Sequence, residues 1–119
     1  MDTTARDREI VKQVILQYAQ LRPSDGHIRL DTVFDETQDR YALMQVGWDR
    51  ERRVRGNLIY VILKDGKVWI EYDGMEPGVS KDLISRGIPE ERIVLAFLPE
   101  QQVAVSAFFE RSPPVTPTR

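Results

Sequence analysis

Cysteine is absent from this chain of 119 residues, and histidine occurs once, at His27. The lack of cysteine excludes disulfide bonds, thiol nucleophiles and sulfur-ligated zinc, and it agrees with a reducing cytoplasm. No apolar run approaches the roughly 18 residues of a membrane-spanning helix, and the N-terminus lacks the charged-then-apolar order of a signal peptide. We therefore expect a cytoplasmic protein without membrane contact.

An excess of charge of either sign is also missing. The chain has 17 Lys and Arg against 19 Asp and Glu, a net charge of −2, so no global positive field attracts nucleic acid. A length of 119 residues with 41% hydrophobic content suits one compact domain. We assign residues 1–110 to this domain and the proline-rich residues 111–119 to a flexible C-terminal tail.

Hydrophobic periodicity predicts a long N-terminal helix followed by a hairpin. From Thr4 to Leu21 apolar residues recur with the helical period, and Thr3 or Thr4 is placed to cap the first turn. Two alternating stretches follow, His27–Phe34 and Tyr41–Trp48, with a polar turn between them. This pattern is typical of two antiparallel strands.

The segment Asn57–Leu63 is apolar on both faces, which favours a central strand covered by a helix on one side and by a partner surface on the other. That second face suggests homo-oligomerisation. Asp65-Gly66 predicts a tight turn into a fourth strand through Tyr72, because both residues tolerate positive φ. Ser80 is expected to cap a short helix that Gly87 ends.

The predicted fold is therefore α+β, a four-stranded antiparallel sheet with a long N-terminal helix packed on one face and a short helix after the sheet. The apolar stretches at 93–97 and 103–109 have no assigned element.

Catalytic and cofactor signals are weak. His27 would serve as a general base only beside a carboxylate or a nucleophile, and an ordinary edge histidine is the alternative. Acidic residues gather around the first hairpin turn, where a metal site competes with a solvated turn; they are Asp31, Asp35, Glu36 and Asp39. The glycines form no phosphate-cradling loop before a helix. We predict no cofactor, no metal and no enzymatic activity.

One segment combines an aromatic residue with concentrated positive charge. The simplest interpretation is a strand-end loop in which arginines pair with nearby acids, while a protein partner and nucleic acid are the functional alternatives. Trp69 alternates outward from its apolar neighbours, so it either packs under a second layer or anchors an interface. The candidate partner-binding residues are Trp48, Asp49, Arg50, Arg52, Arg53, Arg55 and Trp69.

Several short motifs resemble those of the XisI family of fdxN element excision controlling factors. The resemblance covers roughly residues 5–105, and the motifs that carry it are Asp39-Arg40-Tyr41, Val46-Gly47-Trp48-Asp49, Arg53-Val54-Arg55-Gly56, Asp65-Gly66-Lys67-Val68-Trp69-Ile70, Asp73-Gly74 and residues 88–97. One departure follows Phe97, where family members usually continue with His-Pro-Pro and this chain reads Leu98-Pro99-Glu100.

The resemblance implies a cyanobacterial, non-enzymatic accessory protein for site-specific recombination. It also implies a companion, a XisH-like protein that looks like a nuclease fold. Regulation of recombination or neutralisation of that companion are the two modes of action it suggests. A direct DNA-binding factor using Arg50 to Arg55 is the alternative, and a small enzyme built on His27 is a further one.

Overall fold

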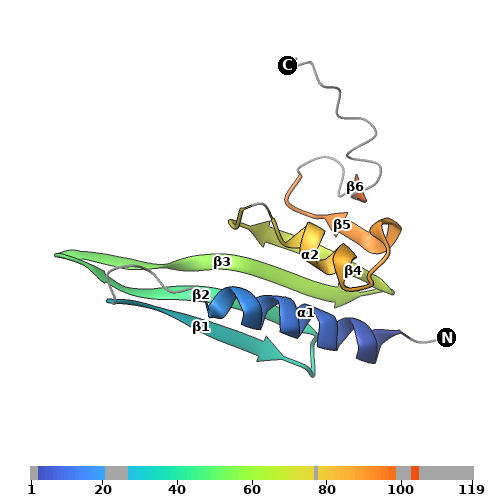
Figure 1. Cartoon of the computed structure of the whole chain (residues 1–119), viewed down its shortest axis with the longest axis horizontal. Coiled ribbons are helices and arrows are strands. Elements are labelled where there is room, and N and C mark those ends of the chain that lie inside the picture. The colour runs from blue at the N-terminus through green and yellow to red at the C-terminus, as the bar shows by residue number, and fades with distance from the viewer. Residues whose placement is uncertain (1–2, 21–26, 77, 99–102, 105–119) are drawn as a thin grey trace, which may run out of the picture.

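The computed structural model describes residues 3–20, 27–76, 78–98 and 103–104, so the predicted tail at 111–119 lies outside the described residues. Along the chain one long helix precedes four consecutive strands, and a short helix and a 3₁₀ helix precede the last two strands (Figure 1). In order they are α1 (Thr4–Ala19), β1 (Ile28–Asp35), β2 (Arg40–Asp49), β3 (Arg52–Lys64), β4 (Lys67–Asp73), α2 (Val79–Ser85), the 3₁₀ helix η1 (Glu90–Arg92), β5 (Ile93–Leu95) and β6 (Val103–Ala104).

The strands form one sheet in the order β1-β2-β3-β4-β5-β6. The first four strands are antiparallel neighbours, as predicted. The prediction of a purely antiparallel four-stranded sheet is wrong, because β5 joins β4 in parallel and β6 then pairs with β5 in the antiparallel sense. The sheet is therefore mixed.

A crossover explains the parallel strand. After β4 the chain passes through α2 and η1 and returns to the same edge, and a connection of this kind is what parallel neighbours require. The side chains of Ile93, Val94 and Leu95 are all buried. Three residues are too few for a periodic pattern, so the sequence analysis assigned no strand here.

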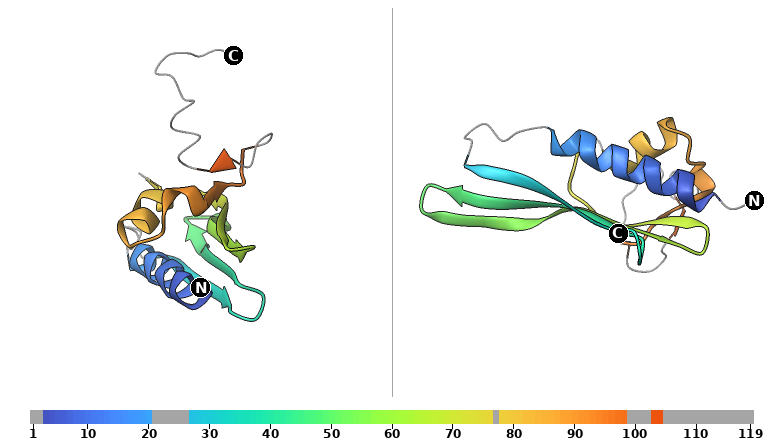
Figure 2. Two further views of the ribbon diagram at one scale, coloured as in Figure 1. Left: turned by 90° about the vertical axis from the view of Figure 1, so that its right-hand side faces the viewer. Right: turned by 90° about the horizontal axis from the view of Figure 1, so that it is seen from below.

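Both helices pack on one side of the sheet (Figure 2). The predicted apolar stripe of α1 is confirmed, since Ile10, Val11, Val14, Ile15 and Tyr18 are buried. Together with Val79 and Leu83 of α2 they share one core with the inner side chains of the strands, which include Tyr41, Leu43, Ile59, Val61, Val68 and Ile70. Among the described residues, no helix is long and apolar enough to cross a membrane.

The ends of the elements show which local predictions were right. Asp65 and Gly66 have φ values of 57° and 73°, as the predicted tight turn requires. Thr3 occupies the N-cap position of α1, but its side chain makes no capping hydrogen bond. The prediction that Ser80 caps α2 is wrong: Gly78 is the N-cap, and Asp73 supplies the acceptor, with its Oδ2 2.9 Å from the Val79 amide nitrogen. A carboxylate from the preceding strand thus replaces a local hydroxyl.

Candidate interaction surface

The strand register divides the side chains of the sheet between two faces. Paired residues of antiparallel strands lie on the same face, and neighbours along a strand alternate. Tyr41 and its partner Val61 face the helices and are buried. The adjacent pair, Ala42 and Tyr60, therefore faces away. We call this second side the open face, because none of the described helices covers it (Figure 2).

The tip of the β2–β3 hairpin carries most of the predicted partner-binding residues. It extends beyond the C-terminal end of α1 (Figure 1). Trp48 pairs with Arg53 in the register and is 49% exposed, and the Arg53 guanidinium lies 5.4 Å from the centre of its ring. Such a contact contributes about 0.5–1 kcal/mol at an exposed site. The indole thus remains accessible.

The predicted strand-end loop is a two-residue turn. Arg52, Arg53 and Arg55 all belong to β3, and Arg50 occupies the turn with a φ of 61°. Asp49 pairs with Arg52 at 3.4 Å, a long contact between two exposed groups that adds little stability. The half-buried Trp48 and the pairing of an arginine with a nearby acid are as predicted, but the connection is a two-residue turn and β3 begins five residues before Asn57.

Trp69 lies on the same open face at the other end of the sheet. It pairs with Ile62, nine residues along β3 from Arg53, which corresponds to about 30 Å of strand. Its Nε1 donates a hydrogen bond to the Lys64 carbonyl oxygen at 3.0 Å, and the Lys64 ammonium lies 4.6 Å from the ring centre. Trp48, Arg53, Arg55 and Trp69 therefore share the open face without forming one cluster, whereas the Asp49–Arg52 pair lies on the other side of the strands and Arg50 in the turn.

The sequence analysis missed the residues between these two ends. Ala42, Met44, Asn57 and Tyr60 line a shallow hollow of about 230 Å³ in the middle of the open face. Val33 of β1 and Tyr72 of β4 flank it in the register, and they are 52% and 47% exposed. Apolar and charged residues alternate irregularly on this side of the strands, so the hollow becomes evident only once β2 and β3 are aligned.

Cations surround the apolar centre of the open face. The register places Asp31, Asp35 and Glu71 on this side among the acids, and a larger set among the bases: Arg29, Arg40, Arg53, Arg55, Lys64 and Lys67. Since the whole chain has a net charge of −2, positive charge is concentrated here. Such a surface is electrostatically complementary to acidic groups.

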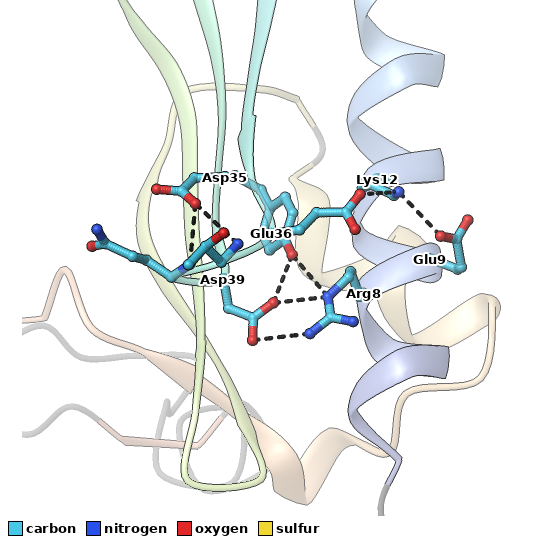
Figure 3. Close-up of polar contacts among 9 residues, drawn as sticks. Arg8, Glu9, Lys12, Asp35, Glu36 and Asp39 are labelled. Carbon is cyan, nitrogen blue, oxygen red and sulfur yellow. Dashed lines mark hydrogen bonds and ion pairs between the residues drawn. The ribbon is translucent and has the colours of Figure 1, made fainter.

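The acids around the β1–β2 turn connect the sheet to α1 (Figure 3). Arg8 Nε lies 2.9 Å from Asp39 Oδ1, and the Tyr41 hydroxyl donates to the same oxygen at 2.6 Å. The hydrogen bond from Arg8 holds the pKa of Asp39 below its usual range. Burial, followed by the hydrogen bond to Asp39, raises the pKa of Tyr41. These groups are structural partners of the helix.

The other acids of the predicted metal cluster also have partners nearby (Figure 3). Glu36 pairs with Lys12 at 2.5 Å, Asp35 accepts hydrogen bonds from the amides of the turn, and Asp31 pairs with Arg29 at 3.1 Å. Within residues 3–20, 27–76, 78–98 and 103–104, no group of His, Asp and Glu is arranged to hold a metal ion.

His27, the candidate base, lies exposed just before β1, and its carbonyl oxygen accepts the Trp48 amide at 3.3 Å. Leu98, at the position of the departure after Phe97, packs against the core, while Phe97 is 46% exposed. An apolar side chain at position 98 serves packing, which a histidine would serve less well.

These features define a small α+β domain that presents one face of a mixed sheet. Residues 1–109 match the family described as XisI protein, and the chain belongs to that family. This confirms the resemblance that the motifs indicated. No curated protein matches the chain.

Two solved structures from Anabaena variabilis ATCC 29413 are similar. One is a XisI-like protein with 26% identity and a TM-score of 0.76, covering 85% of this chain and 97% of its own. The other is described as the fdxN element excision controlling factor XisI, with 28% identity and a TM-score of 0.71, covering 83% of this chain and 96% of its own. The fold is thus shared across nearly the whole of both proteins.

Proposed function

We propose that this protein is a non-enzymatic accessory factor that controls excision of a DNA element together with a XisH-like partner in the cytoplasm of a cyanobacterium. The observation that carries the proposal is membership of the XisI family over residues 1–109. The similarity to a protein described as the fdxN element excision controlling factor XisI supports a DNA element of the fdxN kind as the one whose excision is controlled. A strand exchange reaction itself falls to a separate recombinase.

The hairpin tip supports the choice of a protein-binding role. Trp48 is half exposed and lies beside Arg53, and tryptophan and arginine are the residues most enriched at interface hot spots. The tip also protrudes beyond α1, where a partner can reach it without displacing a helix (Figure 1). A rigid β-hairpin presents these side chains at little entropic cost on binding.

Co-purification with a XisH-like protein at moderate salt tests the proposal. We expect a stable complex that is weakened by Trp48→Ala and by the paired change of Arg52 and Arg53 to alanine. The matched control is the paired change of Lys81 and Arg86 to alanine, which removes the same charge from exposed positions of the α2 segment. If the unchanged protein forms no complex, the proposal that it acts together with a XisH-like partner is contradicted.

Direct DNA binding through Arg50, Arg52, Arg53 and Arg55 is the second candidate function, because these residues gather at one hairpin tip. Binding of this kind would fall steeply with salt, with a slope of about −0.9 for each phosphate contacted. Duplex binding that is lost in the arginine variants, in the absence of a protein complex, would favour this function over the accessory role.

Neutralisation of the companion is the mode of action that we favour. The pairing of a small acidic protein with a nuclease-like companion suggests this mode. Because its net charge is −2, this chain is not expected to compete with the companion for DNA, so inhibition would come through direct contact with the companion. The expected result is that DNA cleavage by the XisH-like protein falls when this protein is added in equal amount. Unaltered cleavage would exclude neutralisation and leave complex formation as a separate question.

A further inference from the structure

The open face holds a buried polar atom that the described chain leaves without a partner. Asn57 Oδ1 is shielded from solvent and accepts no hydrogen bond, although an unsatisfied buried acceptor costs about 1–3 kcal/mol. Asn57 lines the hollow together with Ala42, Met44 and Tyr60. A donor that enters the hollow would satisfy it.

We infer that the open face is the docking surface for the protein partner, with the hollow at Ala42, Met44, Asn57 and Tyr60 receiving one side chain of that partner that brings a hydrogen-bond donor to Asn57 Oδ1, and the surrounding cations meeting its carboxylates. This inference rests on the proposed function for the existence of the partner. It moves the centre of the interface from the hairpin tip to the middle of the sheet, and it makes the tip one edge of a longer contact.

Charge decides what kind of protein fits. The rim bears mainly Arg and Lys, with Arg55 at one end and Lys67 at the other. A second copy of the chain would bring the same cations against them, and like charges facing each other across an interface cost several kcal/mol. A different protein with an acidic surface would avoid this repulsion and would be attracted to the cations of the rim, so it is a better occupant than a second copy.

The aromatic side chains favour a protein over a single-stranded nucleic acid. Bases bind open sheets by stacking on free aromatic faces. The two tryptophans of the face already have a cation over one side of the ring, Arg53 over Trp48 and Lys64 over Trp69. The centre of the face combines the aliphatic side chains of Val33, Met44 and Ile62 with Tyr60 and Tyr72. An apolar centre that includes tyrosine, within a charged rim, is the pattern of protein interfaces.

Binding of a XisH-like protein to full-length variants tests the inference. We expect Val33→Glu and Tyr72→Glu to weaken the complex at least about tenfold. Each change places a negative charge among the apolar contacts, opposite a partner surface that is itself acidic. Val33→Lys should weaken it less than Val33→Glu. Asn57→Leu should weaken it about threefold to tenfold, because it removes the acceptor that the partner's donor would meet. The free protein should be at least as stable as the unchanged one, because its unsatisfied buried acceptor is gone.

Leu16→Glu is the matched control, because Leu16 is an apolar residue of α1 that is 44% exposed on the helix side. It should bind as the unchanged protein does. Circular dichroism and unfolding midpoints would establish that every variant is folded. Equal binding of all variants would overturn the docking surface and leave the proposed function intact, whereas no complex with the unchanged protein would overturn both.

Other occupants give distinct results in the same set of proteins. A dimer in sedimentation equilibrium that Val33→Glu dissociates would assign the face to a second copy and overturn the inference. Binding of a single-stranded DNA oligonucleotide that the same change abolishes would assign it to nucleic acid, with the same consequence. A photo-reactive amino acid in place of Val33 that cross-links to residues 105–119 of its own chain would also overturn it.

Discussion

The two faces of the sheet are built from the same strands and differ in what covers them. Facing α1 and α2, the side chains of Tyr41, Leu43 and Ile59 are completely buried. On the open face Val33 and Tyr72 remain about half exposed. Because exposed apolar area adds little to folding, the covered face supplies stability, and the open face is free to supply binding. Alternation along each strand keeps the two tasks apart.

The largest effect is expected from a cavity in the covered face. Leu43→Ala removes a fully buried side chain from the centre of β2, and we expect a loss of about 3 kcal/mol in the free energy of unfolding. Urea unfolding followed by circular dichroism measures it. A loss below about 1 kcal/mol would contradict the view that this face carries the stability of the fold.

Gly47 tests whether a family motif serves folding or binding. A Cβ at this position would lie 2.2 Å from the His27 carbonyl oxygen and 2.6 Å from the Ile28 Cα. These are backbone atoms, so β1 must shift, and we expect Gly47→Ala to cost about 2 kcal/mol. The neighbouring Val46→Ala, on the open face, is the control. Equal stability of Gly47→Ala and the unchanged protein in urea would show that β1 adapts freely.

A buried ion pair beside the core and an exposed ion pair at the hairpin tip should differ in their contribution to stability. Asp7 is 3% exposed, and its carboxylate contacts Arg92 at 2.5 and 3.0 Å. Asp7→Ala should lower the free energy of unfolding by about 2 kcal/mol, because the Arg92 guanidinium loses its carboxylate partner and is only partly hydrated in return. Asp49→Ala breaks an exposed pair at the hairpin tip and should cost less than about 0.5 kcal/mol. Thermal unfolding measures both variants. Equal losses in the free energy of unfolding would contradict the expected difference between the buried and the exposed pair.

Acid should weaken the attachment of α1 through Asp39. The hydrogen bond from Arg8 lowers the pKa of Asp39 in the folded state, so its contribution is complete above the unfolded value of about 4. It is then lost as the pH falls below that value through the lowered folded pKa. Urea midpoints between neutral pH and pH 3 should therefore fall less in Asp39→Asn than in the unchanged protein. Parallel curves would exclude this pair as a source of acid sensitivity.

The smallest effect on folding is expected from the open face itself. Val33→Ala shortens a side chain that is 52% exposed, and the free energy of unfolding should change by no more than about 0.5 kcal/mol. Differential scanning calorimetry is sensitive enough to detect a larger change. A loss near that of Leu43→Ala would mean that the two faces contribute alike.

The sequence predicted what depends on local periodicity. The buried stripe of α1, the first hairpin and the Asp65-Gly66 turn all follow from residues close in the chain. The parallel strand β5 was missed because its pairing depends on a return to the β4 edge. Ser80 was chosen as a cap because the competing acceptor, Asp73, belongs to another element.

The candidate site was predicted in part for the same reason. Trp48, Arg53, Arg55 and Trp69 were recognised by residue type, and alternation placed Trp69 opposite its buried neighbours. Their common face depends on the register of three strands, which the sequence analysis did not establish. The hollow between them is lined by Ala42, Met44, Asn57 and Tyr60, which lie together only once β2 and β3 are aligned.

The central claim is that folding uses one face and partner binding the other, and the two tryptophans report on it directly. Both lie on the open face, and the chain has no others. Fluorine NMR of protein labelled with 5-fluorotryptophan should give two signals, and addition of a XisH-like protein should shift or broaden both. Formation of a complex that leaves the two signals unchanged would contradict the account.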